Sequence, residues 1–152
     1  MIINRRLLAR AAIAAAAALS TLPAFAQDVT LRLHHFLPAQ ANVPSKALAV
    51  WAQKVEKDSN GRIKVSMFPS MQLGGKPPEL FDQARDGVVD IVWTVLGYTP
   101  GRLPKTEAFE LPFTVGDAEG GSRALWEYIS KNGAEEFKDV HRIANHVHGP
   151  GM

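Results

Sequence analysis

Two pairs of histidines are the residues whose type and spacing come closest to a metal site. His146 and His148 are two residues apart in a segment that predicts a strand, so both project to one face. A third imidazole could come from His34 or His35, and imidazole clusters bind zinc or copper. No Asp or Glu adjoins His146 or His148, however, and the other pair is remote in sequence, so we expect no metal site built from this chain alone.

Aromatic side chains stand where two predicted strands end, which suggests a site for an organic ligand. His35 and Phe36 end the first strand, and because neighbouring side chains alternate, only one of them faces a cleft. Trp93 lies near the end of a later strand and Tyr98 in the loop after it, with core packing as the alternative for both. Since small-molecule pockets are lined mostly by apolar and aromatic side chains, we expect ligand contacts from these four residues and from His148.

The acidic pair Glu107 and Glu110 is three residues apart, which places both on one face of a helical turn. We expect a solvated face with Phe109 and Leu111 packing inward, rather than a pair for acid/base catalysis. Arg102 is interpreted as a solvated turn arginine, with a salt bridge to one of these glutamates as the alternative. The sequence has no phosphate-binding loop, no Gly-x-Ser-x-Gly elbow and no cysteine nucleophile.

Residues 1–26 have the composition of a secretory signal peptide. Three arginines form a basic start, an apolar stretch covers residues 11–19, and Ala24-Phe25-Ala26 resembles a cleavage site. The apolar stretch is shorter than the ~20 residues of a membrane span, although an anchoring helix is the alternative. We expect export by the general secretory route, cleavage after Ala26 and a periplasmic location.

The leader also explains the basic charge of the whole chain. It holds three of the 17 basic residues and none of the 15 acidic ones, so 14 basic residues remain against 15 acidic ones. A near-neutral chain with no long basic run does not support nucleic-acid binding. The absence of cysteine excludes disulfides and thiolate zinc sites.

The pattern of apolar residues predicts alternating strands and helices, which is typical of a parallel α/β sheet. The predicted strands cover residues 29–36, 62–68, 88–95 and 140–147, and the predicted helices cover residues 44–59, 77–87 and 117–139. In such sheets ligands bind beyond the carboxyl ends of the strands. The segment "GYTPGRLPKTEAFELPF", residues 97–113, therefore predicts one wall of a cleft.

Three motifs carry a resemblance to a known family: "GRIKVSMFPSMQLGG", "DGVVDIVWTVLGYTPGRLPKTEAFELPF" and "HVHGPG". In this order and spacing they resemble the DctP-type periplasmic solute-binding proteins of TRAP (tripartite ATP-independent periplasmic) transporters. The resemblance starts near Val29 and runs to the end of the chain. "GYTPGR" and "HGPG" look most like members that bind aromatic, 2-oxo or related carboxylic acids.

This resemblance implies a two-lobed periplasmic-binding-protein fold of type II that closes on an organic acid and delivers it to a membrane permease. Family members are about twice as long, and their second lobe carries the arginine that pairs with the substrate carboxylate. We therefore interpret residues 27–139 as the first lobe and residues 140–152 as the start of the crossover. No arginine of this chain is assigned that missing role, and no catalysis or cofactor is expected.

Two alternatives remain open at this stage. The chain could be a small periplasmic enzyme with a histidine-centred or metal site, in which case turnover would depend on His35, His146 or His148. The chain could also lack a stable fold on its own, because its last strand would have no neighbour and would leave an open sheet edge.

Overall fold

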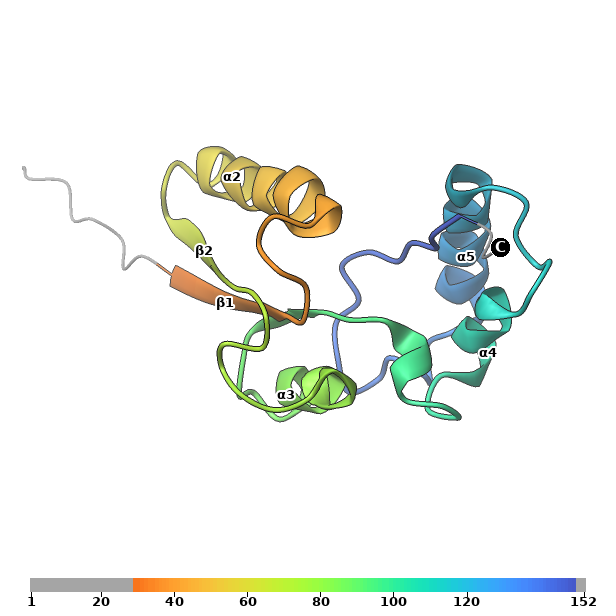
Figure 1. The fold of residues 1–152 in the computed structure, drawn as a ribbon. Helices are drawn as coiled ribbons and strands as arrows, with labels where there is room; N and C mark the ends of the chain where they lie inside the picture. Colours follow the sequence, from red (N-terminus) through yellow and green to blue (C-terminus); the bar gives the residue numbers. More distant parts are fainter. Residues whose placement is uncertain (1–28, 150–152) are drawn as a thin grey trace, which may run out of the picture.

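The computed structural model describes residues 29–149, which contain one parallel sheet with helices around it (Figure 1). The predicted leader, residues 1–26, lies outside the described residues, as do residues 150–152. The strands are β1 (Val29–His35), β2 (Ile63–Phe68) and β3 (Ile91–Trp93). Their order is β2-β1-β3, and β1 pairs in parallel with both neighbours. The predicted parallel α/β class is confirmed.

The register of the sheet places His35 beside Trp93 at its carboxyl end. Partners in parallel strands point to the same face, so these two side chains are neighbours on that face. The third strand is shorter than the predicted span 88–95, because only three of those residues pair with β1. Trp93 is therefore the last residue of β3 and lies at the rim of the sheet, rather than within a strand covered on both faces.

Two helical segments accompany the strands, as the sequence predicted. In Figure 1, α2 lies above the strands and packs against β2, whereas α3 lies below them and packs against β3. Gly61 ends the first segment with a φ of +77°, and its N–H donates to the carbonyl of Glu56 at 2.8 Å, which confirms the predicted left-handed stop. The segments are η1 (Pro44–Leu48) with α2 (Ala49–Asp58), and η2 (Pro77–Glu79) with α3 (Leu80–Arg85).

The core lies between the sheet and these helices. Its most fully enclosed apolar side chains are Leu33, Leu80, Val89 and Leu103, all at most 1% exposed. Leu103 belongs to the segment that follows β3, residues 97–113. A buried leucine at its centre ties that segment to the core, so it is not a loop lying in solvent.

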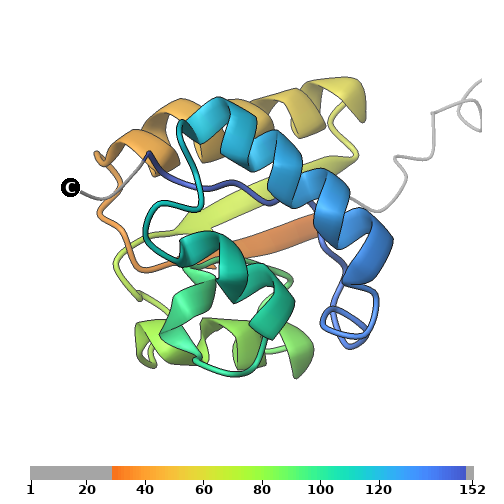
Figure 2. The same ribbon diagram turned by 90° about the vertical axis from the view of Figure 1, so that its right-hand side faces the viewer.

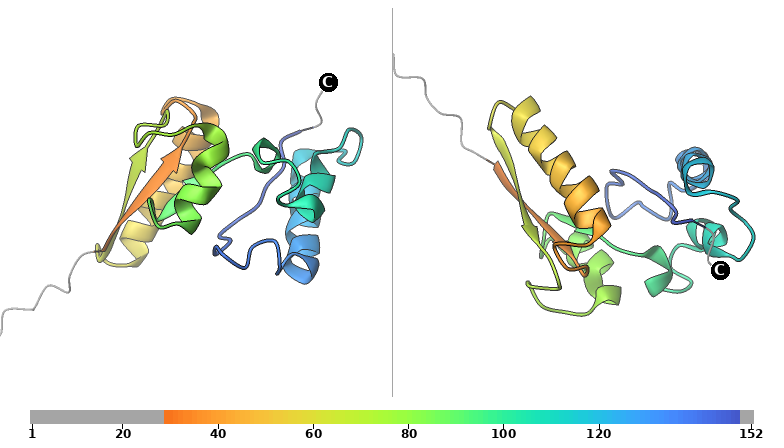
Figure 3. Two further views of the ribbon diagram at one scale, coloured as in Figure 1. Left: turned by 90° about the horizontal axis from the view of Figure 1, so that it is seen from below. Right: turned by 45° about the horizontal axis from the view of Figure 1, so that its top comes forward.

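A second group of helices follows the sheet in sequence. Figure 3 shows α5 and α4 together, set apart from the strands and α2, and in Figure 2 they lie in front of the sheet, toward the viewer. Phe109 packs on Tyr128 with ring centroids 5.6 Å apart, as expected for an inward phenylalanine. The matching prediction for Leu111 is wrong, since Leu111 is 62% exposed. The elements are η3 (Leu96–Tyr98), α4 (Pro104–Glu107), η4 (Ala108–Glu110) and α5 (Ala118–Asn132).

Helix α5 is shorter than the predicted span 117–139. It begins after Asp117, whose carboxylate accepts the N–H of Gly120 at 2.7 Å, and it ends before Gly133. The residues beyond Asn132 make contacts outside α5 instead of continuing the helix. Glu136 accepts the backbone N–H of Lys105 at 2.6 Å and so caps the start of α4. This contact, which joins residues 31 apart, competes with continuation of the helix.

The predicted fourth strand, residues 140–147, does not form. A strand needs a neighbour for its backbone groups, and this segment instead runs past α5. The N–H of Val147 donates to the hydroxyl of Ser122 at 3.0 Å, a side-chain contact in place of a strand ladder. Among residues 29–149, no helix has the length and apolar character needed to cross a bilayer.

Candidate ligand-binding site

Four aromatic rings meet beyond the carboxyl ends of β1 and β3, and we call them the aromatic wall: Phe36, Trp93, Tyr98 and His146. Phe36 stacks on Trp93 with centroids 5.3 Å apart, and it also contacts Tyr98 at 5.3 Å. The indole N–H of Trp93 donates to Nε2 of His146 at 3.0 Å. The structure thus brings together three of the five predicted site residues, because parallel strands end at a common edge.

The aromatic wall remains partly open to solvent. Phe36 and Trp93 are half-buried, and Tyr98 is 41% exposed. Each aromatic contact of this kind adds about 0.5–1.5 kcal/mol beyond area burial, which fixes the rings relative to one another. An exposed and preformed ring surface at a sheet rim is suited to receive a flat apolar body.

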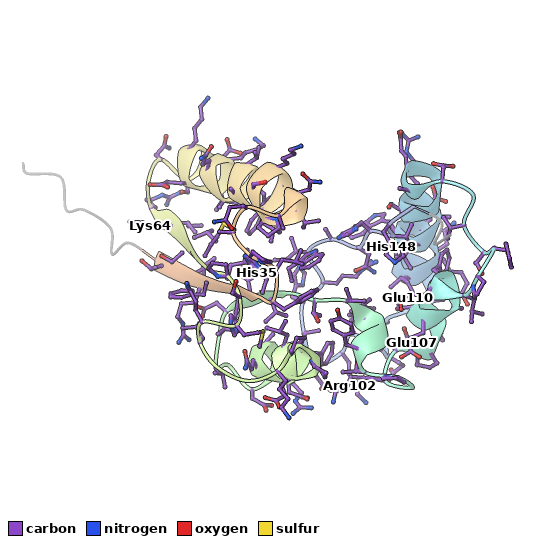
Figure 4. All side chains as sticks on the ribbon, viewed as in Figure 1. His35, Lys64, Arg102, Glu107, Glu110 and His148 are labelled. Carbon is purple, nitrogen blue, oxygen red and sulfur yellow. The ribbon has the colours of Figure 1, made fainter. Side chains whose placement is uncertain are left out.

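Two glutamates hold the loop that carries Tyr98. Glu107 accepts the N–H groups of Gly101 and Leu103 at 3.0 and 3.2 Å, and Glu110 accepts the N–H of Gly97 at 3.2 Å. Figure 4 shows both carboxylates on the turns that follow this loop. Glu110 is exposed, as predicted for a solvated face, and Glu107 is half-buried; both acids also fix backbone geometry next to the aromatic wall.

Arg102 fastens the same loop to α3. Its guanidinium makes a two-point contact with the carboxylate of Asp82, at 2.7 and 3.2 Å, and lies 5.0 Å from the centroid of the Phe81 ring. The hydrogen bond from Arg102 holds the pKa of Asp82 below its ordinary value of 3.8. The alternative pairing of Arg102 with Glu107 or Glu110 is not found, since those carboxylates are bonded to backbone N–H groups.

His35 lies behind the surface of the site. Its side chain is fully buried, and within residues 29–149 neither ring nitrogen has a hydrogen-bond partner. Burial, with the charge of neighbouring His34 as a smaller cause, lowers the pKa of His35 below its ordinary 6.5. Of the two alternating residues, Phe36 is the one that reaches the aromatic wall.

Replacing His35 with leucine is expected to raise the free energy of unfolding by about 1 kcal/mol at pH 7.5, because an unpartnered buried imidazole is removed. The wild type should also lose stability as the pH falls below 6.5. The folded state keeps His35 neutral there, while the unfolded state takes up a proton. Urea denaturation at pH 7.5 and 5.0 measures both effects. An unchanged pH dependence in His35→Leu would contradict this account.

The histidines do not converge on a common centre. Buried His34 shares a 2.7 Å hydrogen bond with Gln83, whereas exposed His148 contacts the carbonyl of Gly149 at 2.9 Å. Figure 4 shows His148 near α5, away from His35 at the end of β1. Within residues 29–149, no group of three or more His, Asp or Glu side chains could hold a metal ion.

His146 is the site residue that the sequence interpretation missed. The predicted strand placed His146 and His148 on one face, but the segment is not a strand, and His146 joins Trp93 instead. The only signal in the sequence was that His146 carries an imidazole ring two residues before the predicted site residue His148. The contact joins residues 53 apart, a pairing that periodicity cannot reveal.

A glycine on α5 lets the segment carrying His146 lie close to the helix. A Cβ at Gly121 would stand 2.0 Å from Val115 and 2.8 Å from Val147, both β-branched side chains with little freedom to move. Helix propensity alone favours alanine over glycine by about 1 kcal/mol. Contacts this short outweigh that gain.

Gly121→Ala is therefore expected to lower the free energy of unfolding by about 1–2 kcal/mol and to displace His146 from Trp93. Urea denaturation gives the first effect, and a red shift of tryptophan emission gives the second. The double variant Gly121→Ala with Val115→Ala removes the shorter contact and should recover part of the loss. Higher stability in Gly121→Ala alone would mean that helix propensity decides.

A separate cavity of about 250 Å³ lies between α3 and the residues after α5. Its lining is mostly charged and includes Arg102 and Glu136, but no residue of the aromatic wall. Arg102 is bonded to Asp82, and Glu136 is bonded to Thr106 at 2.8 Å, so both charges are already engaged. We therefore place the candidate site at the aromatic wall.

The comparisons with known proteins point to one family. The DctP family model, described as bacterial extracellular solute-binding protein, family 7, matches residues 33–144. A marine metagenome TRAP solute-binding protein specific for aromatic acid ligands, solved with 3-hydroxybenzoate, is 54% identical with a TM-score of 0.80, over 82% of this chain and 39% of that chain. A TRAP solute-binding protein from Rhodoferax ferrireducens T118, solved with copurified benzoate, is 53% identical with a TM-score of 0.78, over 80% of this chain and 38% of that one.

The chain is also similar to a curated protein. The outer membrane transporter protein TsaT of Comamonas testosteroni is 31% identical over 150 residues, which cover 97% of this chain and 43% of that protein. The chain thus spans about two-fifths of the length of the relatives it matches. Its parallel sheet, its helices and its match over residues 33–144 lead to one conclusion: the chain belongs to the DctP family of bacterial extracellular solute-binding proteins.

Proposed function

We propose that this chain forms part of the periplasmic solute-binding component of a TRAP transporter, and that it captures an aromatic carboxylic acid for uptake by a membrane permease. The protein changes no covalent bond of its ligand. It reaches the periplasm through the leader predicted for residues 1–26, residues 27–139 form its first lobe, and residues 140–152 begin the crossover. Contact with the membrane is made only through the permease.

The aromatic wall is the observation that carries this proposal. Phe36, Trp93 and Tyr98 hold one another at the sheet rim and stay partly exposed, which suits a ligand with a flat apolar body. Two solved relatives that are 53% and 54% identical to the chain are described with benzoate and 3-hydroxybenzoate. The aromatic wall and these two relatives together favour aromatic acids over sugar acids or short dicarboxylates.

Each predicted site residue has a role in this proposal. Phe36 and Trp93 contact the ring of the acid, and Tyr98 closes the wall with a phenolic group that can donate a hydrogen bond. His148, exposed near α5, contacts the ligand from the crossover side. His35 supports Trp93 from the side, because the two are register partners on one face of the sheet and His35 is fully enclosed.

The contacts of the histidines within residues 29–149 do not favour the alternative of a histidine-centred enzyme. His34 is bonded to Gln83 and His146 to Trp93, so these imidazoles meet different partners. A general base needs a second group that orients it toward a substrate. Among the described histidines, His35 has neither ring nitrogen hydrogen-bonded.

Titration of matched acids tests the proposal. Saturation-transfer NMR on the chain itself detects weak binding. Calorimetry is done on a fusion protein in which residues 29–149 replace the matching segment of the Rhodoferax relative. We expect benzoate and 3-hydroxybenzoate to bind the fusion protein at micromolar concentrations or below. Cyclohexanecarboxylate, which has the carboxylate without the aromatic ring, should bind at least about tenfold more weakly.

A thermal melt of both samples is the control for folding. Signals from benzoate in the NMR experiment keep the test decisive even if the fusion protein does not fold. Equal or stronger binding of cyclohexanecarboxylate or succinate would contradict the aromatic assignment. Absence of binding for every acid in both folded samples would overturn the proposed function.

A further inference from the structure

The hydrogen bond between Trp93 and His146 fixes where the imidazole carries its proton. An indole N–H can only donate, so Nε2 of His146, 3.0 Å away, must accept. A neutral imidazole has one accepting and one donating nitrogen. The proton of His146 is therefore on Nδ1, on the other side of the ring from Trp93.

The two rings lie side by side rather than face to face. Their planes differ by 10° and their centroids are 5.9 Å apart, whereas the bonded nitrogens are only 3.0 Å apart. An indole N–H lies in the plane of its ring, so this combination places the imidazole at the edge of the indole. His146 thus extends the plane of Trp93 and adds a polar edge beside the apolar rings of Phe36 and Trp93.

His146 is also held in place from its own segment. The next residue, Val147, donates its N–H to Ser122 on α5 at 3.0 Å. The His146 side chain is exposed. Among residues 29–149, its ring is hydrogen-bonded to Trp93 alone. An N–H donor that is oriented by its neighbours and still open to solvent is a preorganised recognition group.

We propose that His146 is a specificity-determining residue that donates its Nδ1–H to a carboxylate oxygen of the bound aromatic acid. This inference rests on the proposed function. A carboxylate only accepts hydrogen bonds, so it matches a nitrogen that is fixed as a donor. Three arginines of the second half of the described chain are engaged elsewhere: Arg102 is bonded to Asp82, Arg123 to Glu119, and Arg142 lies over the Trp126 ring at 4.1 Å. His146 supplies the donor from within the aromatic wall itself.

The tautomer is tested on the chain as it exists. Long-range nitrogen–proton NMR of the histidine-labelled chain distinguishes a proton on Nδ1 from one on Nε2. The signals of His146 are identified by their loss in His146→Gln. We expect the Nδ1–H form at neutral pH. A proton on Nε2 would overturn the inference, because the ring could not then accept from Trp93.

Two amide substitutions distinguish the role of Nδ1 of His146 from the role of Nε2. The short amide of His146→Asn reaches the position of Nδ1, and the longer amide of His146→Gln reaches the position of Nε2. In the fusion protein, we expect His146→Gln to bind benzoate about tenfold more weakly than His146→Asn, because only the latter keeps a donor for a charged acceptor. If the fusion protein does not fold, the same order is expected in saturation-transfer signals of the chain.

The ligands separate this inference from the proposed function. Equal benzoate binding by His146→Gln and His146→Asn would overturn the role of His146 while leaving the proposed function intact. Weakening confined to 3-hydroxybenzoate would assign the donor to the hydroxyl group and overturn the carboxylate contact. Failure of the unsubstituted protein to bind any aromatic acid would contradict the proposed function itself.

Discussion

Trp93→Ala is expected to weaken benzoate binding to the fusion protein by about 30- to 100-fold, the range of residues that dominate a binding surface. Trp93 occupies the centre of the aromatic wall. It stacks on Phe36 at 5.3 Å and donates to His146, so its removal takes away one ring and leaves two others without support. Calorimetric titration of benzoate measures the change.

Trp126 provides the matched control for this variant. It is the same residue type and is 42% exposed, but it lies on α5 under Arg142 and outside the aromatic wall. Trp126→Ala should leave the benzoate affinity within about twofold, since surface substitutions away from a site have small effects. An equal loss in both variants would mean that α5 and the wall contribute alike, which would contradict the location of the site.

Leu80→Ala is expected to lower the free energy of unfolding by about 3 kcal/mol, the usual cost of a buried leucine replaced by alanine. Leu80 is the first residue of α3 and is 0% exposed, so its truncation leaves a cavity between that helix and the sheet. Urea denaturation followed by circular dichroism measures the loss. The same experiment on the unsubstituted chain shows whether it unfolds cooperatively.

Val88→Ala is the control for Leu80→Ala. Val88 lies eight positions further along the chain and is 52% exposed, so its truncation should change the free energy of unfolding by less than about 0.5 kcal/mol. A loss below 1 kcal/mol in Leu80→Ala would indicate that α3 does not share one core with the sheet.

The early part of the fold could be predicted because its signals are local. Alternating side chains gave β1 and β2 within one residue, and Gly61 marked the stop after α2 through its left-handed backbone. The part of the fold after β3 depends on contacts between residues that are far apart in the sequence. Glu136 leaves the expected helix to cap α4, and Val147 bonds to Ser122 instead of to a strand.

The candidate site was predictable to the extent that it follows from topology. Parallel strands end at one edge, so Phe36 and Trp93 had to lie near each other. Which of His35 and Phe36 reaches the aromatic wall depends on the residue at which β1 ends. Sequence patterns do not locate strand ends to a single residue. The segment that carries His146 approaches α5 at Gly121, where a Cβ would meet Val147, and no periodicity encodes this steric condition.

Strand β1 comes first in the chain but stands in the middle of the sheet, between β2 and β3. Its second edge is completed only when residues near 91–93 arrive, about sixty positions later in the chain. Distant pairings of this kind form slowly, since a long loop must close before any contact is gained. In a growing chain, β1 can therefore pair with β3 only after about sixty further residues have been added.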